Sequence, residues 1–253
     1  MFHIAINTFK EIIRNKFLYV ILLFAFCFIL LTLTLGTLSL WNENRVIVDF
    51  GLAMIEIFWV LWVLFIGSQL LFNEIQWKTI FLILSKPIQR YEFLLWKFIW
   101  FSYILAIIIA LQSLLFLIIL LLKGIEIDLL ILFSLLYAFL KLEILLSIVL
   151  FFSTFMSNIL TILVSIIVYF MSHSLSLVLD MVRKTGNAIA LYVTNAFTTI
   201  FPPLESINIK NFIGSFQDYS LTFLLSNALY SVIYISVILF LSVIIFNRKK
   251  FEW

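Results

Sequence analysis

The sequence predicts an all-α polytopic membrane protein, and two observations lead to that prediction. Hydrophobic residues make up 65% of the 253 residues and charged residues only 11%, with a mean hydropathy of +1.22. A soluble globular domain carries far more charge. The apolar runs are also continuous over about 20 residues or more, which suits helices that cross a hydrocarbon core of about 30 Å, whereas the strands of a barrel would alternate.

Six of these runs are long enough to span a bilayer. They lie near residues 17–41, 52–72, 98–122, 129–151, 158–181 and 223–246. No tandem repeat or low-complexity linker separates them, so residues 1–253 are expected to form a single transmembrane domain. An even number of spans places both termini on the same side of the membrane.

The distribution of basic residues predicts which side that is. Of the 16 Lys and Arg residues, ten lie on the side of the termini, five lie on the other side, and Lys141 lies inside a span. Because basic residues in short flanking loops resist translocation, we expect the termini and the segment between spans two and three to be cytoplasmic, in a plasma membrane. No basic stretch outside these flanks is long enough to follow a nucleic-acid backbone.

Residues 1–16 show the pattern of an interfacial helix. An apolar side and a neighbouring basic stripe repeat at helical spacing. The apolar side consists of Phe2, Ile6, Phe9 and Ile13, and the basic stripe contains Lys10 and Arg14. Such a helix lies with its apolar face among acyl chains and its basic face among lipid headgroups. The alternative is a basic flank that only sets the topology.

The charged segment 73–97, between spans two and three, is the strongest candidate for a functional site. Apolar residues at i, i+3, i+4 and i+7 predict a short amphipathic helix from Trp77 to Leu84, and Pro87 ends it. A lipid-facing re-entry loop is the alternative, but it does not explain the polar residues around Pro87. The candidate site residues are Glu74, Trp77, Lys78, Thr79, Ile80, Phe81, Leu84, Ser85, Lys86, Pro87, Arg90 and Lys97.

Segment 182–222 is expected to be the largest outer segment. Ile189, Val193, Phe197 and Ile200 have helical spacing and precede Pro202-Pro203, which predicts a short amphipathic helix against the outer leaflet or over the exit of a pathway. A connecting loop without a helix is the alternative.

A few ionisable residues lie inside or at the ends of spans, where they are costly and often functional. Lys141 is expected to pair with Glu56 or with a residue on another helix, and Glu143, two positions later, should point to a different face. His173 is expected to make an interhelical hydrogen bond rather than to bind a metal. These residues form no known catalytic spacing, which disfavours a membrane enzyme, and the single Cys27 is expected to serve packing.

The residues of segment 73–97 resemble those of the permease subunits of ABC-2 type ABC transporters. The likeness rests on Glu74 at the end of span two, Lys78-Thr79, the turn Leu84-Ser85-Lys86-Pro87 with Arg90, and Lys97 at the start of span three. It extends to Arg14-Asn15-Lys16, Pro202-Pro203-Leu204 and Arg248-Lys249-Lys250-Phe251, so it covers nearly the whole chain. It is nearest to the six-span branch described with multi-copper enzyme maturation, although Trp96 stands where that family usually has glycine.

The resemblance implies a permease that pairs with a second copy or a sister permease, each seated on a separate nucleotide-binding subunit. Residues 1–16 would then be the elbow helix, and Thr79 to Leu84 would belong to the coupling helix that docks on the ATPase. ATP and Mg²⁺ would bind to that partner, because this chain has no G-x-x-x-x-G-K-[ST] motif. This chain itself is expected to hold no metal and no cofactor. The expected function is therefore an ATP-driven exporter, and the alternative is a membrane assembly or regulatory factor that transports nothing.

Overall fold

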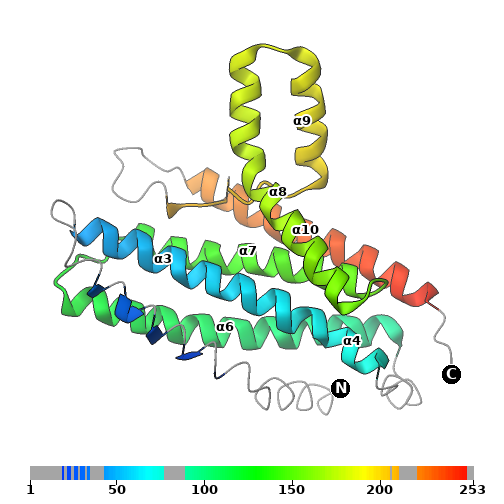
Figure 1. The fold of residues 1–253 in the computed structure, drawn as a ribbon, viewed down its shortest axis with the longest axis horizontal. Helices are drawn as coiled ribbons and strands as arrows, with labels where there is room; N and C mark the ends of the chain where they lie inside the picture. Colours follow the sequence, from blue (N-terminus) through cyan, green and yellow to red (C-terminus); the bar gives the residue numbers. More distant parts are fainter. Residues whose placement is uncertain are drawn as a thin grey trace.

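The computed structural model describes residues 19, 22–23, 26–27, 29–31, 33–34, 43–76, 89–205, 207–210 and 221–249. Within them no strand occurs, and the long elements are helices (Figure 1). Five helices are long and apolar enough to cross a membrane: Asn44–Gln76, Arg90–Leu122, Leu129–Ser153, Asn158–Thr185 and Leu221–Arg248. These five correspond to predicted spans two to six. Most of predicted span one, and the predicted elbow helix, lie outside the described residues.

Span two consists of three consecutive pieces, α3 (Glu43–Trp62), the π-helix η1 (Val63–Gly67) and α4 (Ser68–Gln76). The later spans are α6 (Arg90–Leu122), α7 (Leu129–Ser153), α8 (Asn158–Thr185) and α10 (Leu221–Arg248). α6 and α7 run antiparallel and are joined by a short turn in which Gly124 adopts a φ of +68°. The amide of Ile125 donates to the carbonyl of Leu120 there, which closes the helix end in the way that favours glycine.

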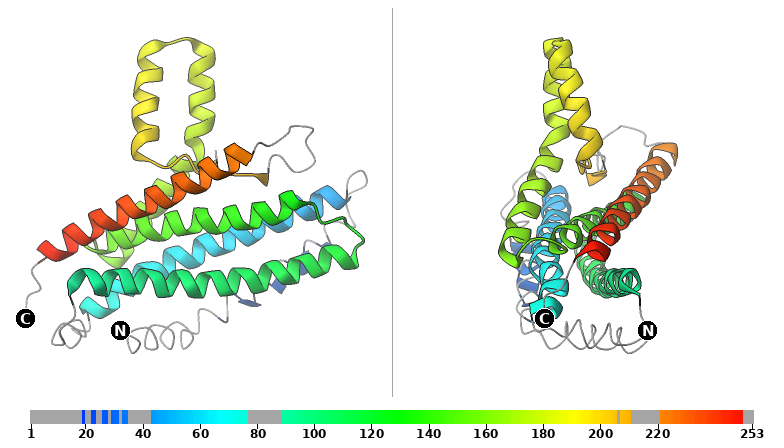
Figure 2. Two further views of the ribbon diagram at one scale, coloured as in Figure 1. Left: turned by 180° about the vertical axis from the view of Figure 1, so that it is seen from behind. Right: turned by 90° about the vertical axis from the view of Figure 1, so that its right-hand side faces the viewer.

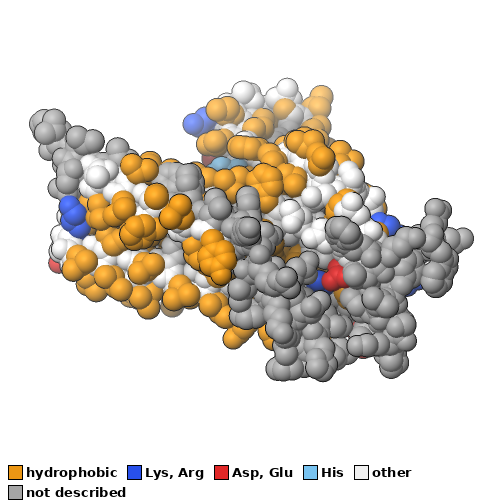
Figure 3. Space-filling view, turned by 60° about the horizontal axis from the view of Figure 1, so that its bottom comes forward, with side chains coloured by type: hydrophobic (Ala, Val, Ile, Leu, Met, Phe, Trp, Pro, Cys, Tyr) orange, Lys and Arg blue, Asp and Glu red, His pale blue; other side chains and the backbone are white. Residues whose placement is uncertain are grey.

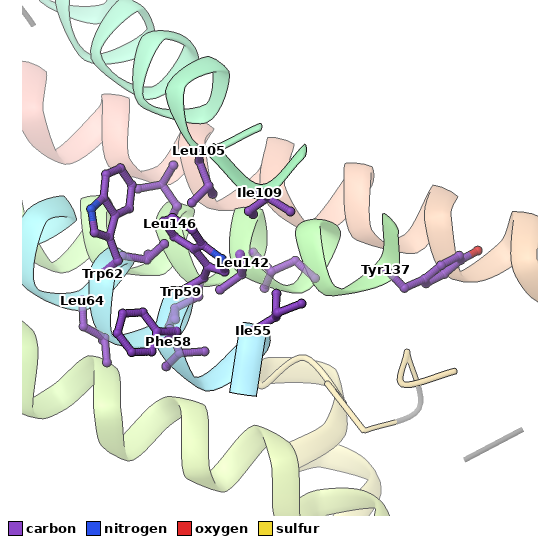
Figure 4. Packing of buried hydrophobic residues seen from close by; sticks show 14 of the residues in the cluster. Ile55, Phe58, Trp59, Trp62, Leu64, Leu105, Ile109, Tyr137, Leu142 and Leu146 are labelled. Atoms are coloured by element: carbon purple, nitrogen blue, oxygen red, sulfur yellow. The ribbon is translucent and has the colours of Figure 1, made fainter. Parts of the chain in front are cut away.

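α7 is the central helix of the bundle, because it contacts α3, η1, α4, α6, α8 and α10. Its sequence is apolar around most of its circumference, as expected for a helix surrounded by other helices. Beside it, Trp59 and Trp62 pack among Leu105, Leu142 and Leu146 (Figure 4). The ring of Trp62 also lies 4.5 Å from that of Phe101, between centroids.

α3 and α6 approach closely at Gly51. A Cβ atom at this position would lie 2.3 Å from a ring atom of Phe116, so only glycine fits beside that ring without a shift. The outward side of α6 instead exposes large apolar residues such as Tyr103, Leu111 and Leu114. Hydrophobic side chains likewise cover much of the described surface in the space-filling view (Figure 3), as a lipid-facing surface requires.

The second half of α8 leaves the bundle and forms an antiparallel hairpin with α9 (Ala188–Ile200). The hairpin projects from the side of the bundle (Figures 1 and 2). Gly186, with a φ of +67°, ends α8, and the Asn187 side chain accepts hydrogen bonds from the amides of Ile189 and Ala190 to begin α9. The predicted helix before Pro202-Pro203 is therefore confirmed, and the alternative of a plain connecting loop is wrong.

Candidate functional site

Three of the residues predicted for the coupling segment lie in the described part of the chain. Glu74 is in the last turn of α4, Arg90 is the first residue of α6, and Lys97 lies two turns further along α6. The Nζ of Lys97 donates a hydrogen bond to Oε1 of Glu74 over 2.9 Å. Both residues are buried, with 1% of Lys97 and 7% of Glu74 exposed. The structure therefore brings together the two ends of segment 73–97, the segment predicted to dock on an ATPase.

Burial makes this ion pair sensitive to the loss of either partner, because the remaining charge would lose a buried group of opposite charge. The ammonium of Lys97 also lies 5.9 Å from the centroid of the Phe93 ring, at a distance where a cation is attracted to the ring face. Phe93 in turn stacks on Phe246 of α10, with 6.1 Å between the ring centroids. The pair is thus packed into the bundle rather than standing on its surface.

Arg90 fastens the beginning of α6 to the end of α10. Its Nη1 donates to the carbonyl oxygens of Asn247 over 3.3 Å and of Lys249 over 2.8 Å, which are among the groups left without intrahelical partners at a helix end. Lys249 donates to the carbonyl of Thr154, just beyond α7, over 2.7 Å. Partial burial lowers the pKa of Lys249. These contacts and the Glu74–Lys97 pair together join α4, α6, α10 and the end of α7.

The remaining predicted site residues lie outside the described residues, so their roles stay predictions. In the coupling segment these are Trp77, Lys78, Thr79, Ile80, Phe81, Leu84, Ser85, Lys86 and Pro87. In the elbow they are Phe2, Ile6, Phe9, Lys10, Ile13 and Arg14.

A second charged cluster lies deep in the bundle. Lys141 of α7 donates to Oε1 of Glu56 on α3, which confirms the first of the two pairings considered for Lys141. Lys210, in the segment between α9 and α10, donates to the other oxygen, Oε2, of the same carboxylate. Glu56 and Lys141 are 5% and 3% exposed. We call these three residues the ion cluster.

A pair of residues next to the ion cluster anchors the same segment to α8. The Nε2 of His173 lies 2.9 Å from Oε2 of Glu205. His173 therefore contacts the non-helical segment that follows α9, whereas the sequence predicted a hydrogen bond to another helix. The amide of Leu204 donates to the carbonyl of Ser172 over 3.2 Å. The side-chain amide of Asn208 also donates to Glu205. Segment 204–210 is therefore held against α3 and α8.

Glu143 lies beside Ser102 of α6, whereas Lys141 binds Glu56 of α3. The two side chains therefore point to different helices, as their spacing predicts. Sequence reasoning missed the roles of Glu205 and Lys210, which were assigned to an outer connection. Their only sequence signal is the group of polar residues Glu205, Asn208 and Lys210 directly after Pro202-Pro203. That pattern does not indicate which residue Lys210 binds, because Glu56 lies 154 positions before Lys210 in the sequence.

The comparison with known families agrees with the helical architecture. The model of the ABC-2 family transporter proteins matches residues 2–251, and no curated protein sequence matches the chain. Members of this family are membrane components of transporters that work with an ABC ATPase and are not themselves catalytic. Since the match covers nearly the whole chain and the helices are those of a multi-pass membrane protein, the chain belongs to the ABC-2 family of transporter proteins.

Proposed function

We propose that the chain is the permease subunit of an ATP-driven exporter in the plasma membrane, with six spans, an N-terminal elbow helix and both termini in the cytoplasm. A separate nucleotide-binding subunit, carrying ATP and Mg²⁺, docks on the coupling segment 73–97. A second copy or a sister permease completes the membrane part. The family match over residues 2–251 supports this function.

The observation that carries the coupling role is the ion pair between Glu74 and Lys97. It fixes the helix before segment 77–88 to the helix after it, so a force on that segment acts on α4 and α6 together. Arg90 and Lys249 then extend the connection to α10 and to the end of α7. Closure of an ATPase dimer against the segment would thereby bias the whole bundle between two states, as a ligand with different affinity for the two states does.

The test is to co-express the chain with a candidate ABC ATPase subunit, purify by a tag on this chain and measure ATP hydrolysis in nanodiscs. Glu74→Lys is expected to reduce ATP turnover, and Glu74→Lys with Lys97→Glu to restore part of it. Glu126→Lys, at the opposite end of the bundle, is the matched charge reversal and should leave ATP turnover unchanged.

A membrane assembly or regulatory factor remains the alternative function. It predicts that no nucleotide-binding subunit co-purifies under mild conditions, or that one co-purifies with ATP turnover that does not respond to Glu74→Lys. Either result would contradict the coupling proposal.

A further inference from the structure

Hydroxyl groups on α8 differ from those on the neighbouring helices. On α7 and α10, Ser134, Ser147 and Ser242 donate to a carbonyl three or four residues earlier, each over 2.7 Å. On α8, the hydroxyl oxygens of Thr161, Ser165, Ser172 and Ser176 have no hydrogen-bond partner among the described residues. Thr161, Ser165 and Ser172 are fully buried, at 0% exposure.

These groups lie along one face of the helix. The side-chain oxygen of Asn158, at the start of the helix, also lacks a partner among the described residues. From Asn158 to Ser176, successive members of the set are three, four, seven and four residues apart, which is the spacing of a single helical stripe. We call Asn158, Thr161, Ser165, Ser172 and Ser176 the α8 polar face. α8 packs against α7, α4 and η1, and a π-helix such as η1 often marks a functional site.

Close packing of helices accounts for the small size of these residues but not for their missing hydrogen bonds. Small residues let helices approach, and a buried serine can still donate to its own helix, as Ser147 does. A buried polar group without a partner costs about 1–3 kcal/mol. Several such groups in one stripe therefore favour a seam that meets water or a polar solute.

The α8 polar face leads to the ion cluster. The Ser172 carbonyl accepts from the amide of Leu204, and the next residue, His173, contacts Glu205 while its Nδ1 has no partner among the described residues. The segment that holds Leu204 and Glu205 continues to Lys210, which binds Glu56. The stripe and the cluster thus meet at one segment.

The ion cluster also lies at a depth where contact with lipid is excluded. Lys141 is twelve residues from each end of α7, or about 18 Å along the helix. Segment 201–209 contains no α-helix in its described residues, and Lys210 fastens its end to this level through Glu56. Non-helical backbone and charges at such depth face protein or a water-filled cavity, not lipid.

We propose that the α8 polar face lines a hydrated path for a polar, hydrogen-bonding cargo, and that the Lys210–Glu56 ion pair closes this path at mid-membrane depth. The proposal that a cargo uses this path rests on the proposed permease function, whereas the proposal that water reaches the α8 polar face does not. Because Lys141 binds the other oxygen of Glu56, the carboxylate keeps one partner when Lys210 leaves. Opening therefore breaks one ion pair without isolating a buried charge.

Cysteine accessibility tests the hydration directly. In the full chain carrying Cys27→Ser, Ser165→Cys and Ser147→Cys are compared in liposomes, using a water-soluble cationic methanethiosulfonate. Both serines are 0% exposed, but only Ser147 has a hydrogen-bonded hydroxyl. Since the thiolate is the reactive form and apolar burial suppresses it, Ser165→Cys should react at least about tenfold faster.

Ser172→Cys is the second site, so that the result does not depend on a single variant, and elution as a monodisperse peak checks folding. If both α8 cysteines react as slowly as Ser147→Cys, the stripe is a dry packing seam and the proposal is wrong.

Lys210→Met, added to Ser165→Cys, tests the closing ion pair. The reaction rate is expected to rise several-fold, whereas Lys184→Met, which removes an exposed charge on the hairpin, should leave the rate unchanged. An unchanged rate with Lys210→Met would overturn the closing role. These measurements need no ATPase, so their failure is distinct from a failure of the ATP-turnover assay.

Discussion

The Nζ of Lys97 lies 2.9 Å from Oε1 of Glu74, although 23 positions separate the two residues. The contact joins the end of α4 to the second turn of α6 inside the bundle, where each side chain is nearly inaccessible to solvent. The segment predicted to bind an ATPase thus begins and ends at one fixed point. A push on it cannot be absorbed by movement of α4 relative to α6 unless this ion pair breaks.

Glu74→Ala is accordingly expected to reduce the free energy of unfolding by about 3–5 kcal/mol, because the buried ammonium of Lys97 loses the carboxylate that it binds. The exchanged pair, Glu74→Lys with Lys97→Glu, should recover a substantial part of that loss. Thermal unfolding in detergent, followed by tryptophan fluorescence, measures both. If the exchanged pair is no more stable than the single variant, the two residues do not stabilise the bundle through each other.

Arg90→Ala is expected to loosen the end of α10, because the carbonyls of Asn247 and Lys249 lose a charged donor. The predicted cost is about 1–3 kcal/mol, with faster amide hydrogen exchange in the last turn of α10. Arg45→Ala is the matched control, since Arg45 forms an exposed pair with Asp49 at 3.5 Å and such pairs contribute about 0–1 kcal/mol. Equal exchange in both variants would contradict a fastening role for Arg90.

The five described spans were predictable because long apolar runs have few other stable arrangements in a bilayer. Predicted span 129–151 became α7, Leu129–Ser153, with the same first residue. The contacts between helices were less predictable. The pairing of Lys141 with Glu56 could be anticipated, since each is a rare charge in a span, whereas Lys210 belongs to a short polar connection that offers no periodicity.

Two features of the fold have no usable sequence signal at all. The π-helix Val63–Gly67 consists of the residues Val-Leu-Phe-Ile-Gly, which suit an ordinary buried helix equally well. The projection of the α8–α9 hairpin also depends on where α8 stops packing, and its apolar pattern continues past that point. Leu177 and Met181 of α8 are exposed, yet they are as apolar as residues inside the bundle.

Gly51→Ala is expected to destabilise the bundle by about 1–3 kcal/mol, as overpacking of a filled core does. The added Cβ would meet the ring of Phe116 at 2.3 Å. Phe116→Leu in the same chain should relieve part of the clash, so the double variant is expected to be more stable than the sum of the two single effects predicts. Additive losses in thermal unfolding would contradict the contact. Gly124→Ala is not a suitable control, because its positive φ adds backbone strain.

Lys141→Met is expected to be more harmful than the double variant Glu56→Gln with Lys141→Met. In the single variant, Lys210 alone would compensate the buried carboxylate, whereas the double variant removes both the carboxylate and the central ammonium. Lys210 has 15% of its side chain exposed and can turn towards solvent once Glu56 is neutral. Leaving a buried charge uncompensated costs about 3–5 kcal/mol. Because Lys210 still binds Glu56, the loss in Lys141→Met should lie below that range, and the loss in the double variant should be smaller still. Thermal unfolding of the two variants, with Lys184→Met as the exposed control, measures the difference. A double variant less stable than Lys141→Met would contradict the prediction, because the charge of Glu56 would then not be the cause of the loss in Lys141→Met.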